Sequence, residues 1–308
     1  MSQIASREPR QSRQGSAETA GSANGGSTQI SPVQEATRPT VATVNQNFYD
    51  GLWSGSHVVL PHRFNTWPRL ASLAASAPAR LEIGPGLRPR LPILGTSFVD
   101  ISRPALSGLK ACGGHAMHGE ITALPFPDCS FDLVCAFDIV EHIEDDRQAF
   151  RELSRVAKDD ATVIFSVPLH PDRWTSFDTL VGHARRYDPS HLLAILEEHA
   201  LALEQSALFG MQPRNGWLLD FAVWGMTHKR AQAMRWYNGI FLPIGLFLQP
   251  RLAWTSGLID VANVDEILLV CRRNRRQTCL MSAEDVGRES LQAAEKVKED
   301  RTKKQARI

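Results

Sequence analysis

Predicted strands and amphipathic helices alternate along the middle of the chain, and this alternation constrains the fold more than any other sequence feature. The runs Phe131–Phe137 and Thr162–Val167 are rich in Val, Ile and Phe, as expected of strands buried on both faces. Between them, residues 146–157 carry apolar side chains at helical spacing. Such alternation predicts a doubly wound α/β fold, with helices on both faces of a parallel sheet. The other predicted strands are residues 80–83, 97–99, 203–209 and 265–272, and the other predicted helices are residues 64–77 and 188–200.

Two polar segments flank the predicted domain. Residues 1–44 consist mainly of Ser, Gln, Gly, Thr and Ala, and such a segment buries too little apolar surface to offset the entropy of ordering it. Residues 275–308 are strongly charged. We therefore expect one folded domain over residues 45–274, with a disordered tail before it and a charged tail after it. The chain is 43% hydrophobic, which is sufficient for a core of that size.

Charge and cysteine usage exclude several classes of protein. The net charge of +1 provides no overall field that would attract nucleic acid, so no nucleic-acid partner is expected. The five cysteines are scattered and form no C-x-x-C pair, which is typical of a reducing compartment. Residues 1–13 are polar and basic and lack the apolar stretch of a secretory signal. We therefore expect a cytoplasmic protein.

The turn after the first predicted strand carries the strongest motif. The segment Arg80–Arg88 reads RLEIGPGLR, so that Gly84 and Gly86 directly follow a short buried strand. Glycines at such a turn let the backbone approach a ligand closely at the carboxyl end of a parallel sheet. The dinucleotide-binding fingerprint requires a third glycine at position 89, where this chain has Pro89.

Three further segments follow in order along the chain. Asp100 ends the second predicted strand, where its carboxylate is placed to accept hydrogen bonds from both hydroxyls of a ribose. Residues 119–132 read GEITALPFPDCSFD, and residues 131–142 read FDLVCAFDIVEH. Together with the glycine turn, these segments resemble the motifs of class I S-adenosylmethionine-dependent methyltransferases, of the methyltransferase type 11-like group. The resemblance covers roughly residues 49–274.

The resemblance carries expectations for fold, cofactor and site. It implies a Rossmann-like, mostly parallel seven-stranded sheet with a helical insertion before the last strand, in an enzyme that transfers a methyl group from S-adenosylmethionine. It places Glu120 and the Ile121 amide at the edge of the adenine. The full set of implied cofactor-binding residues is Glu82, Gly84, Gly86, Asp100, Glu120, Ile121 and Phe137.

One position departs from the family pattern. The family's third glycine falls at position 88, where this chain has Arg88, followed by Pro89. The guanidinium of Arg88 or Arg90 is a candidate partner for the carboxylate of the cofactor, since arginine pairs well with carboxylates. The alternative is that Arg88 is a solvated surface arginine.

Two histidines are candidate catalytic bases. His142 follows the fourth strand, and His183 lies in the connection after the fifth strand, on the rim where a doubly wound fold binds its ligands. Imidazoles accept protons near neutral pH. The neighbouring Asp188 and Ser190 are expected only to cap the following helix.

The same region contains a candidate metal site. If residues 138–142 form a helical turn, Asp138, Glu141 and His142 share one face, and His183 completes a set of four ligands. The pattern resembles the E-x-x-E-H motif with a distant histidine of ubiquinone-pathway O-methyltransferases and small-RNA 2′-O-methyltransferases. This mixed oxygen and nitrogen set favours Zn²⁺, Mn²⁺ or Co²⁺ over Mg²⁺. The alternative is that Glu141 and His142 line the pocket or cap a helix without metal.

Residues 211–263 are expected to form a helical, partly apolar insertion over the substrate pocket. Its nine-residue apolar run, residues 240–248, is too short to span a bilayer, which requires about 20 residues. Aromatic and basic residues surround this run, so residues 236–254 suit either a buried lid or peripheral contact with the inner face of a membrane. The methyl acceptor is accordingly expected to be a small-molecule or lipid-like compound, methylated at oxygen.

Two other functions remain open on sequence alone. A methyltransferase-like scaffold that binds without catalysis is compatible with Arg88 at the glycine position and with the two tails. A nicotinamide-dependent reductase shares the architecture, but Pro89 and the Leu-Pro-Phe segment at residues 124–126 argue against it.

Overall fold

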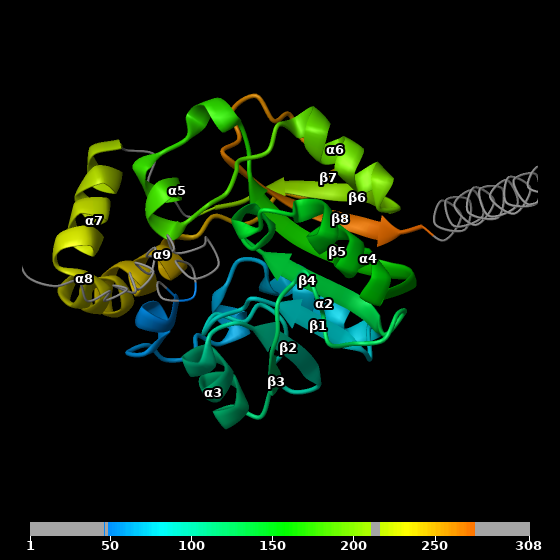
Figure 1. Cartoon of the computed structure of the whole chain (residues 1–308), viewed down its shortest axis with the longest axis horizontal. Helices are drawn as coiled ribbons and strands as arrows, with labels where there is room; N and C mark the ends of the chain where they lie inside the picture. The colour runs from blue at the N-terminus through cyan, green and yellow to red at the C-terminus, as the bar shows by residue number, and fades with distance from the viewer. Residues whose placement is uncertain (1–45, 47–48, 211–215, 275–308) are drawn as a thin grey trace, which may run out of the picture. The chain divides into compact units, whose positions relative to one another are not determined.

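The computed structural model describes residues 46, 49–210 and 216–274 (Figure 1). Within these residues one mixed sheet of eight strands runs through the domain. The strands are β1 (Arg80–Ile83), β2 (Thr96–Asp100), β3 (His115–His118), β4 (Phe131–Phe137), β5 (Ala157–Pro168), β6 (Leu201–Leu208), β7 (Thr255–Ser256) and β8 (Glu266–Arg273). The α-helices are α2 (Trp67–Ser76), α3 (Arg103–Ala111), α4 (Asp146–Val156), α5 (Ser176–Val181), α6 (Pro189–Glu198), α7 (Gly216–His228), α8 (Arg230–Trp236) and α9 (Leu242–Leu248).

The sheet order is β3-β2-β1-β4-β5-β8-β6-β7. The first five strands of this order are mutually parallel. β8 lies antiparallel between β5 and β6, and β7 pairs antiparallel with the far side of β6. The predicted doubly wound, mostly parallel α/β fold is confirmed, whereas the predicted count of seven strands is wrong. The additional strand is β7, two residues long, which forms on returning from the helical insertion.

The side chains of β4 point alternately to the two faces of the sheet, and their neighbours show which helices cover each face. Val134 and Ala136 point into a core beneath α4 and α6, whereas Leu133 and Cys135 point into a second core beneath α2. All four side chains are fully buried, as expected for a central strand in a sheet covered on both faces. Helices α4 and α6 therefore cover one face and α2 the other.

Local sequence explains where these helices begin. The Asp145 side chain accepts a hydrogen bond from the Gln148 amide at the start of α4, and the Asp188 side chain accepts from the amides of Ser190 and His191 at the start of α6. Pro189, which lacks an amide hydrogen, occupies the first turn of α6. The expected capping role of Asp188 is confirmed.

The insertion between β6 and β7 contains α7, α8, the short π-helix η4 (Tyr237–Phe241) and α9. In Figure 1 these helices lie together with α5 beyond one edge of the sheet. The Ser176 hydroxyl of α5 donates to the Asp220 carboxylate of α7 at 3.2 Å, which links the insertion to the connection after β5. Among the described residues, no helix combines the length and apolar character needed to cross a bilayer.

Three predicted segments lie wholly or partly outside the described residues. These are the tails at residues 1–44 and 275–308 and the first five residues of the insertion, 211–215.

Candidate active site

The loop after β1 is shaped by its two glycines and by Glu82. Gly84 and Gly86 have φ values of 63° and 56°, which glycine adopts without strain. A Cβ atom at Gly84 would lie 2.2 Å from Ile139, and one at Gly86 would lie 2.2 Å from Trp53, so both positions also need glycine for space. Glu82 accepts hydrogen bonds from the amides of Arg90 and Leu91, and these bonds hold the end of the loop against β1.

Asp100 connects the end of β2 to the same loop. One of its carboxylate oxygens accepts from the Gly86 amide at 2.8 Å, and the other accepts from the Ser102 amide at 2.7 Å. Each oxygen retains a further lone pair for a hydroxyl donor. Burial raises the pKa of Asp100 to about 6 and that of Glu82 to about 7, against the opposing effect of these backbone hydrogen bonds.

The remaining predicted cofactor residues line the same cavity. Ile121 is buried and Glu120 is exposed, and both lie on the segment between β3 and β4. Phe137 ends β4, where its ring lies 6.3 Å from that of Phe209. The structure thus brings all seven predicted cofactor residues to the carboxyl edge of the sheet, with Glu82 turned towards the backbone of its own loop.

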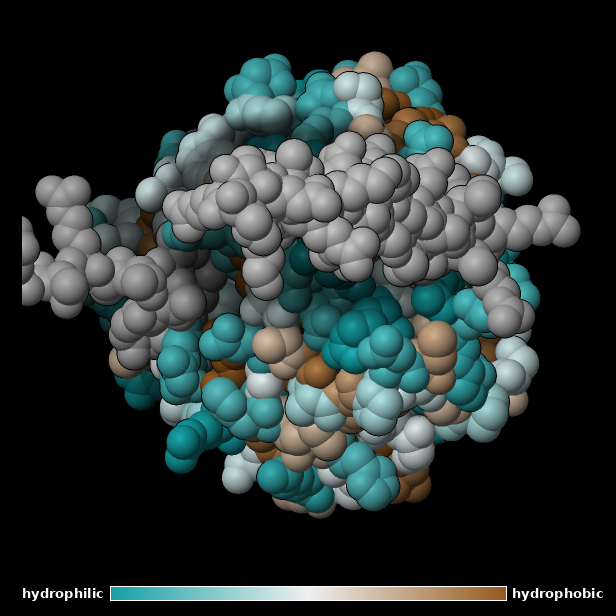
Figure 2. Space-filling model, turned by 45° about the vertical axis from the view of Figure 1, so that its right-hand side comes forward, coloured by the Kyte–Doolittle hydropathy of each residue, from teal (hydrophilic) through white to brown (hydrophobic). Residues whose placement is uncertain are grey.

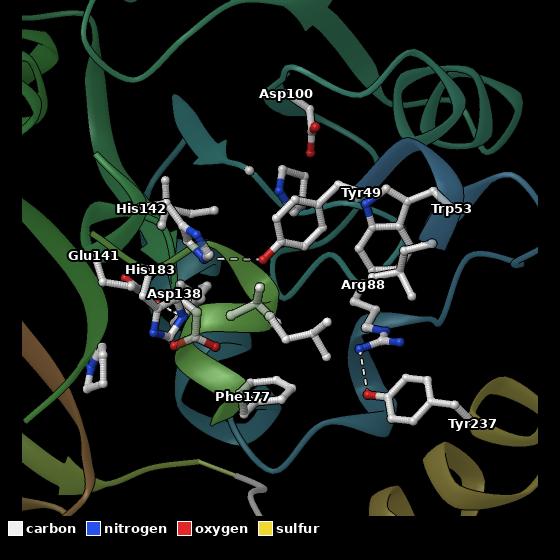
Figure 3. Close-up of a pocket in the computed structure, with 18 of the residues that line it drawn as sticks. Tyr49, Trp53, Arg88, Asp100, Asp138, Glu141, His142, Phe177, His183 and Tyr237 are labelled. Carbon is white, nitrogen blue, oxygen red and sulfur yellow. Dashed lines mark hydrogen bonds and ion pairs between the residues drawn. The ribbon is translucent and has the colours of Figure 1, made fainter. Parts of the chain in front are cut away.

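The cavity has a volume of about 1570 Å³ and reaches from the glycine loop to the insertion. Typical ligand pockets have volumes of about 300–1,000 Å³, so this one has room for a cofactor and a second molecule. Figure 3 shows Asp100 on one side of it, the group Asp138, Glu141, His142 and His183 on another, and Phe177 from α5 between them and Tyr237. A doubly wound fold binds its ligands at this edge.

His142 is held by both of its ring nitrogens. Nδ1 lies 3.1 Å from the Gly182 carbonyl oxygen, and Nε2 lies 3.2 Å from the Tyr49 hydroxyl (Figure 3). Because a carbonyl only accepts, Nδ1 carries the proton and Nε2 is the acceptor. Burial, followed by the neighbouring His183, lowers the pKa of His142 to about 3, so its imidazole is neutral at physiological pH.

His183 is oriented by a buried carboxylate. Its Nδ1 lies 2.8 Å from Asp178 Oδ1, and its Nε2 is directed towards Glu141, 3.9 Å from Oε1. Asp178 also accepts from Arg186 and from Thr175. Burial alone would raise the pKa of Asp178, but hydrogen bonds from His183, Arg186 and Thr175 outweigh it and hold that pKa well below the usual range.

Glu141 completes a cluster with the two histidines. One ligand atom from each of Glu141, His142 and His183 lies within 4.8 Å of the others. Glu141 is buried, its Oε2 has no hydrogen-bond partner among the described residues, and burial together with Asp138 raises its pKa well above the usual value.

Asp138 lies outside this cluster. The predicted helical turn over residues 138–142 is wrong at its first residue, because the 3₁₀ turn η2 covers only Val140–His142 and Asp138 has a φ of 54°. Asp138 Oδ1 instead accepts from the Ser166 hydroxyl at 2.5 Å, and the Asp138 carboxylate is hydrogen-bonded with Glu266.

The three-residue cluster has the chemistry of a metal site. Each histidine donates its Nδ1 proton to an oxygen, Gly182 O or Asp178 Oδ1, as metal-ligating histidines do. Nε2 of His183 is directed towards Glu141, whereas Nε2 of His142 would exchange its hydrogen bond from Tyr49 for a metal. The unpartnered oxygen of Glu141 is an orphaned acceptor that a cation would satisfy. These residues therefore fit a divalent metal with a mixed oxygen and nitrogen ligand set.

Several site residues were missed by sequence reasoning because their partners are distant in the chain. Tyr49 and His142 are 93 residues apart, and Arg88 and Tyr237 are 149 residues apart. Asp178 is a partial exception. The spacing T-x-x-D from Thr175 is a capping-box signal, and the structure contains that capping box.

The central part of the sequence matches a known family. Residues 82–165, which include the glycine loop, Asp100 and the His142 turn, match the family model described as a methyltransferase domain. The chain is 39% identical over 68 residues to ajmaline N-methyltransferase of Rauvolfia serpentina, a match that covers 22% of this chain and 23% of the relative. It is 37% identical over 75 residues to an uncharacterized methyltransferase of Bacillus subtilis, covering 24% of this chain and 29% of the relative. The matched stretches thus span less than a third of the length of these relatives.

The fold was also compared with solved structures. A methyltransferase of Thermotoga maritima, described as a possible histamine N-methyltransferase, is similar with a TM-score of 0.48 and 13% identity, over 75% of this chain and 100% of that chain. Residues 82–165 of this chain are similar to the methyltransferase domain family, and they include the glycine loop and the His142 turn.

Proposed function

We propose that this chain transfers a methyl group from S-adenosylmethionine to a hydroxyl oxygen of a small-molecule or lipid-like acceptor. The observation that carries the proposal is the position of His142 and His183. Both imidazoles lie in the wall of the cavity that also contains the glycine loop and Asp100. That of His142 is uncharged, and that of His183 is supported by the Asp178 carboxylate. A hydroxyl needs a proton acceptor on becoming a nucleophile, and this wall supplies one.

The cofactor supplies a methyl group on a sulfonium centre, which is an intrinsically good leaving group. The chain's own residues then bind and align. The Gly84–Gly86 backbone provides a close approach, and Asp100 retains lone pairs for the ribose hydroxyls. Glu120 and the Ile121 amide lie at the place proposed for the adenine. Alignment of two reactants in a dry pocket accounts for a large part of the acceleration of such a displacement.

His183 is the better placed of the two bases. Its Nδ1–H is fixed by the buried carboxylate of Asp178, which sets the tautomer and stabilises the imidazolium that forms when Nε2 takes a proton. His142 Nε2 already accepts from Tyr49, so we assign His142 to holding and orienting the acceptor beside its neighbour, 4.6 Å away between ring centroids.

As the alternative to a histidine base, we propose that Glu141, His142 and His183 hold a divalent metal, with Zn²⁺, Mn²⁺ or Co²⁺ preferred to Mg²⁺ and with the Tyr49 hydroxyl displaced from His142 Nε2. A metal at this place would lower the pKa of an acceptor hydroxyl and orient its lone pair. Gly182 and Asp178 would fix the orientation of the two imidazoles through their Nδ1 atoms.

Three measurements test the proposal. Calorimetric titration with S-adenosylhomocysteine should show binding, and its absence in the wild-type protein would overturn the function. Turnover with labelled S-adenosylmethionine and a cell lipid extract should fall strongly in the His183→Ala variant. Turnover in the presence of excess chelator tests whether the activity requires a metal. Full activity, with no metal found by elemental analysis, would leave His142 and His183 acting without it.

Exposed apolar residues on the insertion support a lipid-like acceptor. Eight of the thirteen large hydrophobic side chains that are exposed among the described residues lie on α7 to α9, and Phe247 is 86% exposed. By contrast, Figure 2 shows hydrophilic and hydrophobic residues interspersed on the coloured part of the face that it presents. Several of the eight, such as Trp236 and Phe241, also line the cavity, so apolar surface continues from the outside to the site.

We propose peripheral contact of residues 236–254 with an anionic membrane. Residues 216–254 include four basic side chains and a single acidic one, Asp220, which complements anionic lipid. The free cysteines at the surface, Cys112 and Cys129, are consistent with the reducing, cytoplasmic side of such a membrane.

Vesicles containing phosphatidylglycerol should therefore sediment with the wild-type protein. Replacing both Phe241 and Phe247 by Asp should abolish co-sedimentation without changing the melting temperature, since both side chains are exposed. Failure of the wild type to sediment with any lipid composition would leave the insertion as a lid alone.

A further inference from the structure

The guanidinium group of Arg88 lies between two aromatic rings. Its central carbon is 5.0 Å from the ring centroid of Trp53 on one side and 5.0 Å from that of Tyr237 on the other. Nη1 donates a hydrogen bond to the Tyr237 hydroxyl at 3.0 Å (Figure 3). The donors of a guanidinium lie along its edges in the plane of the group, so a further partner would bind there.

One edge of this group is buried and unpartnered. Nη2 of Arg88 is shielded from solvent and has no hydrogen-bond partner in the described part of the chain. None of the ion pairs among the described residues includes Arg88, although the side chain lines the cavity. Buried charges are normally paired, and an unmade hydrogen bond at a charged group is costly.

The second arginine of the loop provides a contrast. Arg90 also packs on an aromatic ring, with its guanidinium 3.8 Å from the centroid of Phe64. Burial lowers the pKa of Arg90, and the nearby carboxyl groups of Asp138, Glu82 and Glu266 act in the opposite direction. The two arginines differ in their hydrogen bonding: among the buried side-chain atoms without a partner in the described part of the chain, Arg88 contributes Nη2 and Arg90 contributes none.

We propose that Arg88 binds an oxyanion of a ligand, a carboxylate or a phosphate, in the plane of its guanidinium. The proposal rests on the methyl-transfer function above and extends it. Two sources supply such a group in this cavity: the carboxylate at the methionine end of the cofactor, and an anionic headgroup on a lipid-like acceptor. In-plane recognition of either is the geometry in which arginine surpasses lysine.

The anion site joins three separate parts of the chain. Arg88 belongs to the cofactor loop, Trp53 to the helical segment at residues 49–53, and Tyr237 to the insertion. Leu52, Trp53, Leu87 and Met234 pack in one apolar cluster around the same place. An anion on Nη2 would neutralise the charge at the centre of this junction, so that its binding stabilises the insertion against the cofactor loop.

The first arm of the experiment separates the cofactor carboxylate from the rest of the cofactor. Wild type and Arg88→Ala are titrated calorimetrically with S-adenosylhomocysteine and with 5′-methylthioadenosine, which lacks the amino-acid carboxylate. If the cofactor supplies the anion, the variant should bind S-adenosylhomocysteine about 10- to 100-fold more weakly, the range for a hydrogen bond to a charged group. Its affinity for 5′-methylthioadenosine should stay within about twofold of wild type, since this ligand keeps the nucleoside and the sulfur but lacks the amino-acid part that carries the carboxylate.

The second arm tests an acceptor headgroup. With 5′-methylthioadenosine at saturation, both proteins are titrated with dodecyl phosphate and with uncharged dodecyl maltoside. If the acceptor supplies the anion, Arg88→Ala should weaken only the binding of dodecyl phosphate. Arg88→Lys keeps the charge but loses the planar donor edge, so it should recover only part of the loss. Arg147→Ala, which removes an exposed arginine of α4, is the control for loss of one positive charge.

Three results would overturn the proposal. In the first, Arg88→Ala binds S-adenosylhomocysteine as the wild type does, and dodecyl phosphate binding is unchanged or absent. In the second, the variant loses both nucleosides equally, which would make Arg88 a support of the loop alone. In the third, Arg147→Ala reproduces the effect. Thermal unfolding of each variant confirms that it is folded. A wild-type protein that binds neither nucleoside contradicts the methyl-transfer function instead, and the dodecyl phosphate arm, run without nucleoside, then tests Arg88 alone.

Discussion

Buried acids at the carboxyl edge of the sheet have raised pKa values, and each is tied to a different partner. Glu82 holds the backbone of the cofactor loop, Asp100 holds the loop to β2, and Glu141 faces two histidines with one oxygen unpaired. Strongly perturbed acids gathered around one cavity are typical of a functional site. At this scale the site is a set of acids whose burial disfavours their charged forms.

Asp100→Ala should weaken S-adenosylhomocysteine binding without unfolding the protein. The change removes the acceptor proposed for two ribose hydroxyls, at a cost of about 1.5–3 kcal/mol, the range for hydrogen bonds to a charged group. Calorimetry measures this loss. The matched control is Asp172→Ala, an exposed acid on the connection after β5, which should bind as the wild type does. Equal affinity in the two variants would contradict the role of Asp100.

Glu82→Gln should reduce the dependence of stability on pH. The folded-state pKa of Glu82 is about 7, above the ordinary 4.5, so the folded state binds this proton more tightly than the unfolded state. The contribution of Glu82 to the free energy of unfolding is therefore full below pH 4.5 and is lost as pH rises to about 7, by roughly 3 kcal/mol at most.

Urea unfolding at pH 5 and pH 8 measures this effect. The wild type should lose more stability than the Gln variant between the two values, because Gln has no proton to lose. Asp100 adds a smaller loss of the same sign in both proteins, since its pKa is also raised, and this cancels in the comparison. Identical losses in wild type and variant would show that Glu82 does not titrate in this range.

At the scale of elements, the connection between β5 and α6 is organised by one side chain. Asp178 caps α5 through Thr175, orients His183 and pairs with Arg186, whose guanidinium is also buried. Removing the acid leaves a buried arginine charge without its partner.

Asp178→Ala should therefore destabilise the protein by about 3–5 kcal/mol, the range for a broken buried ion pair. Urea unfolding provides the measurement. Asp178→Asn keeps the shape but not the charge, so it should recover part of the stability while leaving turnover low, because His183 loses the carboxylate that stabilises its imidazolium. Normal turnover in the Asn variant would remove Asp178 from the mechanism.

The periodicity of apolar residues predicted long apolar elements such as β4 and α4. It missed the short strands β3 and β7, which contain polar residues. β4 has the predicted bounds Phe131–Phe137, and α4 ends one residue before its predicted end. β3, with the sequence HAMH, contains two polar residues in four, and β7 contains only Thr255 and Ser256. Such short strands form because a neighbouring strand offers hydrogen-bonding groups, which is a tertiary effect and not a property of their own sequence.

The site residues also fall into two groups, those that belong to a local sequence motif and those that do not. The glycine loop, Asp100 and the Glu141–His142 pair lie in short segments whose spacing is visible in the sequence. Tyr49, Tyr237 and Glu266 reach the cavity from parts of the chain that have no motif, and only folding brings them there. The position of Asp138 could not be anticipated either, because helical spacing assumes a turn that its φ of 54° excludes.

At the scale of the whole molecule, we expect the described domain to fold and bind without its tails. Deleting residues 1–39, or residues 275–308, should leave the melting temperature and the affinity for S-adenosylhomocysteine nearly unchanged, because neither segment has the apolar content to contribute to a core. Differential scanning calorimetry and titration of both truncated proteins provide the measurement. Loss of the folded state in either would place the domain boundary elsewhere.

Because β6 and β7 pair antiparallel, the insertion between them, α7 to α9, is topologically the loop of a β-hairpin. Ser206 pairs with Thr255, so the chain leaves the sheet and returns to it at adjacent positions. The free energy of closing a loop grows only slowly with its length, so the sheet tolerates exchange of this loop for another at little thermodynamic cost. If the insertion forms the acceptor side of the cavity, as proposed, that side can diversify while the strands that hold the cofactor loop keep their register. Grafting this loop between relatives would then be a direct route to altered acceptor choice.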